Sequence, residues 1–278
     1  MSPETDAAPP GTAVVTGASS GIGAAYAQHL AAAGHDLVLV ARRADRLQRL
    51  AGALSAAGAR VEVLVADLAD AGDRSAVAER AARPDVGLLV NNAGINGYGP
   101  FRDADPAVLA QVVDLNVTAP TLLARAALPG MLQRGRGAVI NVASLLALAG
   151  SLPPDPLPAR AAYAGSKGYL VTFTRTLAAE LAGSGVIAQV VCPGYTATEF
   201  HLASGLEPVV EGAPDVVGHS AAAMPAEDVV RASLAALATG EVVCVPGLAD
   251  PAAVDRLVDA ELGVRSASGP RLAARYLT

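Results

Sequence analysis

Seven short apolar segments alternate with Ala- and Leu-rich segments along most of this 278-residue chain. The apolar segments span residues 12–16, 36–41, 60–66, 86–91, 138–143, 186–191 and 241–245. Such continuous apolar runs favour strands that are buried on both faces. The segments between them have helical spacing, at residues 21–33, 43–57, 70–82, 106–133, 162–182 and 225–239. This alternation predicts an α/β fold, in which a doubly wound, seven-stranded, mostly parallel sheet carries helices on both faces.

The length fits one large domain, and no low-complexity linker divides the sequence. We expect a single domain over residues 11–263, a disordered N-terminal tail at 1–10 and a C-terminal tail at 264–278. Two stretches break the strand–helix alternation, the proline-rich 150–160 and the connection 195–224. Long irregular segments in compact α/β domains are more often functional than accidental, so both are candidates for contact with a ligand.

Composition and charge exclude several classes of protein. Hydrophobic residues make up 52% of the chain and charged residues 17%, which supplies a core and excludes global disorder. A net charge of −6, with no basic cluster longer than an Arg pair, argues against nucleic acid as a partner. The acidic, proline-rich N-terminus does not resemble a targeting signal, and the apolar runs are shorter than a membrane span. A cytoplasmic protein without a membrane partner is therefore expected.

Cysteine and histidine give no indication of a metal site. Cys192 and Cys244 lie inside apolar runs, as buried thiols of a reducing compartment do, and no disulfide is expected. His201 and His219 are too isolated in the sequence to indicate metal ligands.

The segment TGASSGIG (16–23) follows the first apolar run and opens the first helical segment. Its three glycines allow a tight turn and a close approach of the backbone to a phosphate. The following helix start offers free N–H groups to an anion, and the two serines can cap the helix or bind phosphate. At the carboxyl end of a strand, the segment predicts a Rossmann-type dinucleotide site, although its Gly-x3-Gly-x-Gly spacing differs from the commoner Gly-x-Gly-x2-Gly. The expected cofactor contacts here are Gly17, Ser19, Ser20, Gly21, Ile22 and Gly23.

Four further motifs follow in a fixed order: NNAG (91–94), DLNVTAP (114–120), Ser144 after the fifth apolar run, and YAGSK (163–167). Together with TGASSGIG, they resemble the motifs of the short-chain dehydrogenase/reductase (SDR) family over residues 12–198. The segments ARRADRL (41–47) and EVVCVPG (241–247) are most similar to the NADP(H)-preferring bacterial oxidoreductases of that family.

The motifs place a catalytic group on one helix. Tyr163 and Lys167 are four residues apart, so they lie on one helical face, one turn apart. A nearby ammonium, with the positive nicotinamide of an oxidised cofactor, is expected to draw the pKa of Tyr163 from about 10 towards neutrality. Ser144 is expected to donate a hydrogen bond to the substrate oxygen. The resemblance implies that Asn116 sustains a water-linked proton path to Lys167, which also contacts the nicotinamide ribose.

The residues after the second apolar run indicate which cofactor binds. NAD-preferring relatives usually have an acid there, which binds the ribose 2′-hydroxyl. In this chain Ala41 takes that position, and Arg42 and Arg43 follow it. A guanidinium suits the 2′-phosphate of NADP, so NADP(H) is the expected cofactor, with Arg42 the stronger candidate. The alternative is that both arginines merely face solvent.

The resemblance implies further cofactor contacts after other strands. Asp67 is expected to accept a hydrogen bond from the adenine amino group, and it also suits the N-cap of the next helix. The segment PGYTAT (193–198) is expected beside the carboxamide, with Thr198 a stronger contact than Thr196. The full set outside the glycine-rich segment is Arg42, Arg43, Asp67, Leu68, Asn92, Ala93, Gly94, Tyr163, Lys167, Pro193, Gly194, Thr196 and Thr198.

Eighteen residues separate Ser144 from Tyr163, more than relatives usually have, and the surplus is proline-rich. Proline fixes φ and has no N–H, so this insertion is expected to be a stiff irregular loop. Because two catalytic residues flank it, we expect it at the mouth of the active site as part of the substrate wall. The alternative is a solvent-exposed excursion. The connection 195–224 is expected to be the family's variable substrate loop.

These features favour an NADPH-dependent carbonyl reductase or alcohol dehydrogenase, which transfers a hydride between nicotinamide and a carbonyl or secondary alcohol with Tyr163 as acid–base. An alternative is non-redox chemistry on the same fold: epimerisation, dehydration or cyclisation. A non-catalytic NADP-binding sensor is more remote, because such proteins typically lose the Tyr or Lys. The family also implies a homodimer or homotetramer, with the helices near 106–133 and 162–182 at the interface.

Overall fold

The computed structural model describes residues 11–153, 157–200 and 223–277. In this part of the chain, seven strands form one sheet in the order β3-β2-β1-β4-β5-β6-β7, and all neighbouring strands are parallel. The strands are β1 (Thr12–Thr16), β2 (Leu37–Ala41), β3 (Val61–Val65), β4 (Val86–Asn91), β5 (Gly137–Val142), β6 (Val186–Val191) and β7 (Val243–Cys244). The strand order reverses between β1 and β4, as in a doubly wound Rossmann fold. The predicted fold is confirmed.

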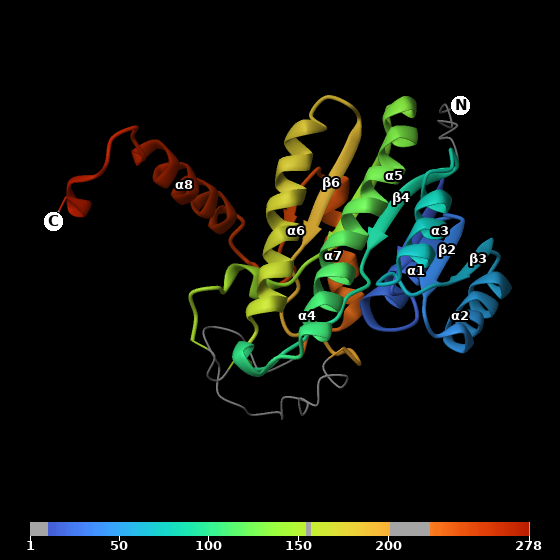
Figure 1. The fold of residues 1–278 in the computed structure, drawn as a ribbon. Coiled ribbons are helices and arrows are strands. Elements are labelled where there is room, and N and C mark those ends of the chain that lie inside the picture. Colours follow the sequence, from blue (N-terminus) through green and yellow to red (C-terminus); the bar gives the residue numbers. More distant parts are fainter. Residues whose placement is uncertain (1–10, 154–156, 201–222, 278) are drawn as a thin grey trace. The chain divides into compact units, whose positions relative to one another are not determined.

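Helices cover both faces of this sheet (Figure 1). One face carries α1 (Gly21–Ala32), α2 (Ala44–Ala56) and α7 (Ala226–Ala238). The other carries α3 (Ala71–Ala81), α5 (Ala119–Arg134) and α6 (Ala161–Glu180), and α4 (Pro106–Val113) contacts α6.

Consecutive residues of a central strand pack in two separate apolar cores, one on each face of the sheet. Val14 and Val139 pack in the core beneath α3, α5 and α6, whereas Val15 and Ile140 pack in the core beneath α1, α2 and α7. All four side chains are fully buried. Successive side chains of a strand point to opposite faces, so a strand covered on both sides is apolar at every position. This explains the continuous apolar runs in the sequence.

The observed elements differ from the predicted ones in three places. The last strand, β7, has two residues instead of the predicted 241–245. The predicted helix 106–133 consists of α4 and α5 joined by a π-helical segment, Asp114–Thr118. A further helix, α8 (Ala252–Ala267), was not predicted.

The chain divides into two compact units, Met1–Pro246 and Gly247–Thr278. All seven strands lie in the first unit, and α8 lies in the second. The predicted domain end at residue 263 therefore falls within α8, and the domain boundaries stay a prediction.

The continuous helical stretch Pro106–Arg134 is long and apolar enough to cross a membrane by length and composition alone, with a mean hydropathy of 1.4. This was not apparent from the individual apolar runs of the sequence. In the fold, the stretch contacts β4, β5, α3 and α6, and 39% of its most apolar window is buried. Core helices of water-soluble proteins pass the same test, so the stretch is weak evidence for a membrane span.

Candidate active site

The glycine-rich turn between β1 and α1 has a backbone that requires its glycines. Gly17 and Gly21 have φ angles of 66° and 52°, in the left-handed region that favours glycine. A Cβ on Gly17 would lie 2.7 Å from the side-chain nitrogen of Asn92, and one on Gly21 would lie 2.8 Å from Thr198 Cγ2. A Cβ on Gly23 would clash with the carbonyl oxygen of Gly17. The glycines thus allow the protein's own segments to pack closely at the predicted phosphate site.

Thr16, at the end of β1, joins this turn to the NNAG segment. Its hydroxyl accepts hydrogen bonds from the backbone N–H groups of Asn92 and Ala93, at 2.9 and 3.1 Å. The Asn92 side-chain amide donates to the carbonyl oxygens of Thr16 and Gly17, at 3.0 and 3.3 Å. These bonds fix the carboxyl ends of β1 and β4 together where the strand order reverses, the place at which doubly wound sheets bind ligands.

The start of α1 fits an anionic ligand. Ser20 is the N-cap residue, but its side chain makes no capping hydrogen bond, and the first turn has no acidic residue. The hydroxyls of Ser19 and Ser20 instead accept hydrogen bonds from Arg43, at 2.6 to 3.1 Å. Helical N–H groups, hydroxyls and a guanidinium all favour a phosphate. The residues present therefore fit the phosphate-bearing half of a dinucleotide.

Three arginines and two carboxylates lie at the surface beside this turn. Arg42 pairs with Asp67, at 3.6 Å. Arg43 and Arg46 both pair with Oε2 of Glu199, at 2.9 and 2.5 Å. The sequence favours Arg42 over Arg43 as the contact for a 2′-phosphate. In the structure, Arg43 is the arginine that reaches the serines of the turn, so it is not merely facing solvent.

Tyr163 and Lys167 lie one turn apart on α6, as the spacing predicts. Their exposed fractions are 5% and 3%. Lys167 Nζ lies 5.9 Å from the centre of the Tyr163 ring and donates a hydrogen bond to the carbonyl oxygen of Val142, at 2.8 Å. The ring of Tyr98 meets the Tyr163 ring edge-on at 5.2 Å, and the ring of Phe200 lies 5.9 Å from it. The phenol therefore has an ammonium group and two aromatic rings as neighbours.

Asn116 lies in the π-helical segment between α4 and α5 and is fully buried. Its Oδ1 accepts a hydrogen bond from the Ile95 N–H at 3.0 Å, and its Nδ2 donates to the Ile95 carbonyl oxygen at 2.8 Å. Nδ2 also donates to Ser166 Oγ at 3.0 Å, and Ser166 donates to the carbonyl oxygen of Tyr163 at 2.8 Å. Asn116 is thus connected to the catalytic helix through Ser166.

Gly94 brings the NNAG segment against two of the predicted catalytic residues. A Cβ on Gly94 would lie 3.1 Å from Asn116 Oδ1 and 3.3 Å from Lys167 Nζ. The two polar groups therefore approach the same backbone position. The water-linked path from Asn116 to Lys167, which the family resemblance implies, stays a prediction.

Ser144 has two roles in the geometry. It is the N-cap of a short 3-10 helix, Leu145–Leu148, and its hydroxyl accepts a hydrogen bond from the Leu146 N–H at 3.2 Å. The Ser144 side chain also hydrogen-bonds to Tyr163, which tends to lower the pKa of the phenol. Helix capping and contact with the catalytic tyrosine are therefore compatible.

Burial sets the protonation of the catalytic pair. It raises the pKa of Tyr163 to about 12, against the smaller effect of the Ser144 hydrogen bond. It lowers the pKa of Lys167 to about 8. The predicted lowering of the phenol's pKa is therefore wrong for the protein alone, because the loss of water around the ring outweighs the hydrogen bond from Ser144. The effect of a positive nicotinamide concerns the cofactor and stays a prediction.

The PGYTAT segment lies beside both parts of the site. The carbonyl oxygen of Pro193 accepts a hydrogen bond from the Leu145 N–H at 2.8 Å, next to Ser144. Thr196 is buried, and its hydroxyl donates to the carbonyl oxygen of Gly194 at 3.1 Å. Thr198 approaches Gly21, as described above. Thr198 is thus the threonine placed at the glycine-rich turn, and its rank over Thr196 as a cofactor contact stays a prediction.

Two predicted cofactor residues contribute their side chains to the apolar cores. Leu68 is buried beneath the α3 face, and Ile22 packs against the core on the α1 face. The N-cap of α3 is Asp70, whose side chain accepts hydrogen bonds from backbone N–H groups of the first turn. The alternative role of Asp67 as the cap of that helix is therefore wrong.

Arg160 organises the proline-rich insertion three residues before Tyr163. The side chain is 7% exposed. It donates to four backbone carbonyl oxygens at 2.8 to 3.5 Å, those of Ala149, Leu152, Pro153 and Pro158. The Gly99 N–H donates to the Ala159 carbonyl oxygen at 2.9 Å, which fastens the insertion to the loop after β4. The part of the insertion that the structure describes is thus held in place at both ends.

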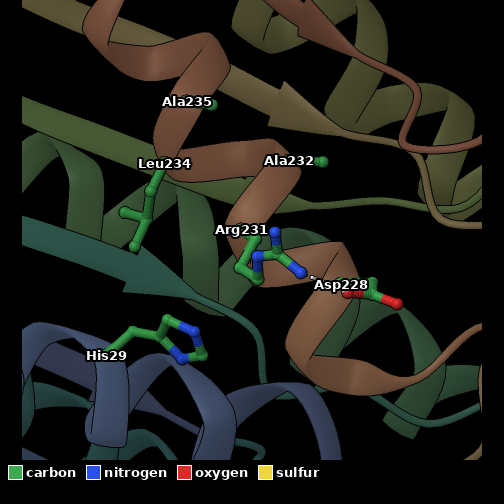
Figure 2. A pocket seen from close by; sticks show the side chains of 6 residues that line it. All are labelled: His29, Asp228, Arg231, Ala232, Leu234 and Ala235. Atoms are coloured by element: carbon green, nitrogen blue, oxygen red, sulfur yellow. Dashed lines mark hydrogen bonds and ion pairs between the residues drawn. The ribbon is translucent and has the colours of Figure 1, made fainter.

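A shallow groove lies between α1 and α7, away from these residues (Figure 2). Figure 2 shows Arg231 turned towards Asp228, with which it forms an ion pair at 3.1 Å. None of the residues predicted to bind cofactor or act in catalysis lines this groove, so it is not a candidate active site. Its lining residues are His29, Asp228, Arg231, Ala232, Leu234 and Ala235.

In the described ranges, no group of three or more His, Cys, Asp or Glu residues comes together to hold a metal. Cys192 and Cys244 are buried and free, as their apolar surroundings predict. His201, His219 and most of the expected substrate loop, at 201–222, lie outside the described residues.

The residues of the site that were not predicted from the sequence include Thr16, Arg46, Tyr98, Arg160, Ser166, Glu199 and Phe200. Two of them had a usable signal. Ser166 is a small polar residue within the YAGSK motif, and Arg160 is the cation at the end of the proline-rich stretch. The others act through contacts between segments far apart in the chain, which no local pattern indicates.

The chain matches the family model for short chain dehydrogenases over residues 11–206. A curated relative, a short chain dehydrogenase of Pseudocercospora fijiensis, is 37% identical over 227 residues, which cover 80% of this chain and 68% of that protein. The chain therefore belongs to the short-chain dehydrogenase/reductase family, a family of oxidoreductases that use a nicotinamide cofactor.

Two solved structures are similar over almost the whole chain. A short-chain dehydrogenase from Sphingobium yanoikuyae in complex with NADPH has a TM-score of 0.87 and 34% identity, and covers 96% of this chain and 100% of that one. The bulky-bulky ketone specific alcohol dehydrogenase from Comamonas testosteroni has a TM-score of 0.83 and 31% identity, and covers 96% and 99%. These similarities confirm the predicted family and fold and support a redox reaction.

The raised pKa of Tyr163 can be tested by titrating the protein without cofactor. Because burial raises this pKa to about 12, the phenol should stay protonated to about pH 10.5. Tyrosinate absorbance of the wild type and of Tyr163→Phe should therefore coincide from about pH 8 to about pH 10.5. Loss of the absorbance of one tyrosinate in Tyr163→Phe over this range would contradict the assignment.

Proposed function

We propose that this protein is an NADPH-dependent oxidoreductase that transfers a hydride between nicotinamide and a carbonyl or secondary alcohol. The observation that carries the proposal is the group formed by the buried Tyr163 and Lys167 and the half-buried Ser144 at the carboxyl ends of the strands, next to a glycine-rich turn suited to phosphate. Membership in a family of oxidoreductases supports the reaction type.

Each side chain of the site has a separate role in carbonyl reduction. Tyr163 donates its phenolic proton to the substrate oxygen, and Ser144 donates a hydrogen bond to the same oxygen as charge develops there. The nicotinamide, when bound, supplies the hydride that the carbonyl carbon accepts. Lys167 stabilises the phenolate that remains, and its low exposure strengthens this attraction. In the oxidation direction, the alcohol returns its proton to Tyr163.

The high pKa of Tyr163 suits its proposed role as the proton donor in reduction. Reduction needs a phenol that begins protonated, and burial keeps it so at neutral pH. Asn116 acts through Ser166, whose hydrogen bond to the Tyr163 backbone helps to hold the start of the catalytic helix in position. Asn116 is thus a positioning residue in this proposal.

Preference for NADP(H) is supported by the position of Arg43. Its guanidinium lies against Ser19 and Ser20 at the helix start, where the phosphate-bearing half of a dinucleotide fits, and Arg42 lies next to it in the chain. A planar guanidinium suits a phosphate, and Ala41 brings no repelling acid. The NADPH complex of the Sphingobium yanoikuyae relative supports the same choice.

The substrate is proposed to be a ketone with sizeable apolar substituents. Tyr98 and Phe200 place aromatic rings beside Tyr163, and the insertion held by Arg160 adds a fixed wall near the same residue. The Comamonas testosteroni relative acts on bulky-bulky ketones, which supports this substrate class.

Replacing Tyr163 tests the reaction itself. Tyr163→Phe removes the proton donor but keeps the ring, so the rate of NADPH oxidation with a ketone should fall about 10²- to 10⁴-fold. NADPH binding, followed by cofactor fluorescence, should remain. Tyr276→Phe should keep full activity. An active Tyr163→Phe would overturn the proposed role, and product formed without NADPH consumption would indicate the non-redox alternative.

Cofactor preference is tested by titrating NADPH and NADH side by side. The wild type should bind NADPH more tightly, and Arg43→Ala should weaken NADPH binding about tenfold, since a charged hydrogen-bond partner of the phosphate is lost. NADH binding should change little. Arg49→Ala is the matched control, because Arg49 lies on the same helix and pairs with Asp45. Equal affinity of the wild type for both cofactors would show that the preference is wrong.

The substrate wall is tested with Arg160→Lys. Lysine keeps the charge, but a single ammonium cannot span the four carbonyl oxygens that the guanidinium holds. KM for bulky ketones should rise several-fold while NADPH affinity stays unchanged. Arg102→Lys, at a side chain that is 87% exposed, is the control. An unchanged KM and substrate range would place the insertion outside the substrate pocket.

The oligomeric state and the cytoplasmic location stay predictions. Apolar side chains on α5 and α6 are exposed, at 46% for Leu122, 44% for Leu132 and 37% for Tyr169. They support contact between copies of this chain, as the family resemblance implies. Light scattering of the purified protein would decide between monomer, dimer and tetramer.

A further inference from the structure

Glu199 forms ion pairs with the arginines beside the predicted 2′-phosphate site. A single carboxylate oxygen of Glu199 accepts hydrogen bonds from both Arg43 and Arg46, at 2.9 and 2.5 Å. The same Arg43 guanidinium reaches the serines of the glycine-rich turn. The two arginines hold the pKa of the Glu199 carboxyl below its usual range, so this carboxylate is ionised at neutral pH. A negative charge of the protein thus already lies where a phosphate is expected.

The ion pairs also connect two parts of the fold that are distant in sequence. Arg43 and Arg46 belong to the start of α2, whereas Glu199 belongs to the segment 195–200, which follows β6. Thr198, the preceding residue, approaches Gly21 at the start of α1. Phe200, the following residue, lies against the ring of Tyr163. A change at Glu199 is therefore positioned to move a side chain at the catalytic tyrosine.

We propose that Glu199 competes with the 2′-phosphate of NADP(H) for Arg43 and Arg46, and that cofactor binding releases the Glu199 end of the segment 195–200 from α2. This inference rests on the proposed preference for NADP(H). A phosphate dianion offers three acceptor oxygens, whereas Glu199 uses one oxygen for both arginines. Because carboxylate and phosphate repel each other, both cannot occupy the arginines without cost. NADH has no 2′-phosphate and leaves the Glu199 ion pairs in place.

If Glu199 competes with the phosphate, it weakens the binding of NADP(H) although it lies in the binding site. Removing a carboxylate that pairs with the phosphate-binding arginines should strengthen binding of the phosphorylated ligand. Removing a residue that merely stabilises the site should weaken it. The direction of the change therefore separates competition from a structural role.

The experiment measures binding of 2′,5′-ADP and 5′-AMP by calorimetry to the wild type, Glu199→Gln and Asp45→Asn. Glu199→Gln should bind 2′,5′-ADP about three- to tenfold more tightly, as expected when two exposed ion pairs no longer have to be broken, and 5′-AMP within about twofold of the wild type. Asp45 lies on α2 between the two arginines in sequence but pairs with Arg49, so Asp45→Asn removes the same charge without touching the cluster. It should change 2′,5′-ADP binding less than about twofold.

Hydrogen exchange gives a second readout that does not need cofactor. The amides of residues 195–200 should exchange faster in Glu199→Gln than in the wild type, and Asp45→Asn should not share this effect. Unchanged exchange in Glu199→Gln would overturn the release of this segment.

The outcomes separate this inference from the proposed function. If the wild type prefers 2′,5′-ADP to 5′-AMP but Glu199→Gln binds it no more tightly, the competition is wrong and the NADP(H) preference stands. If Asp45→Asn gained the same affinity for 2′,5′-ADP, the effect would come from the net charge of the protein, and the competition would be wrong. If neither protein distinguishes the two ligands, the NADP(H) preference fails and the competition fails with it. If only Glu199→Gln prefers 2′,5′-ADP, the competition is supported and the wild-type preference is wrong.

Discussion

The hydrogen bonds between Thr16 and the NNAG backbone are the constraint on which the rest of the site depends. They fix the ends of β1 and β4 at the reversal of strand order, where the chain leaves the sheet towards opposite faces. The glycine-rich turn extends from one side of this junction, and Gly94 from the other. Because Gly94 lies against both Asn116 and Lys167, the cofactor half and the chemical half of the site share one piece of backbone. Displacement of either half would disturb the other.

Low polarity around Lys167 is the second requirement of the chemistry. The ammonium has a backbone carbonyl oxygen as its hydrogen-bond acceptor, so its charge remains available to a phenolate that forms nearby. A competing anion would remove that advantage. The neighbouring thiol of Cys192 is kept neutral, because burial raises its pKa to about 12. Burial thus keeps the Tyr163 phenol and the Cys192 thiol neutral, whereas Lys167, whose pKa burial lowers only to about 8, still carries its positive charge at neutral pH.

Features that follow from a local repeat in the sequence could be predicted, whereas features that depend on contacts between distant segments could not. The sheet, its covering helices and the pairing of Tyr163 with Lys167 follow from apolar runs and helical spacing. The π-helical turn at Asn116 could not be predicted, because a single extra residue per turn leaves the apolar pattern almost unchanged. The direction of the Tyr163 pKa shift was missed for a related reason. Spacing shows that an ammonium is near, but only packing shows how much water the ring has lost.

The hydrogen bonds of Arg160 imply that the proline-rich insertion could be transferred to a related protein only together with this arginine. The described part of the insertion provides backbone carbonyl oxygens, and the guanidinium that binds them belongs to Arg160, the last residue of the stretch 150–160. A protein engineer who grafted only the proline segment onto a related scaffold would transplant acceptors without their donor. The useful unit of exchange is the stretch 149–160, which includes both the acceptors and their donor and leaves α6 almost unchanged.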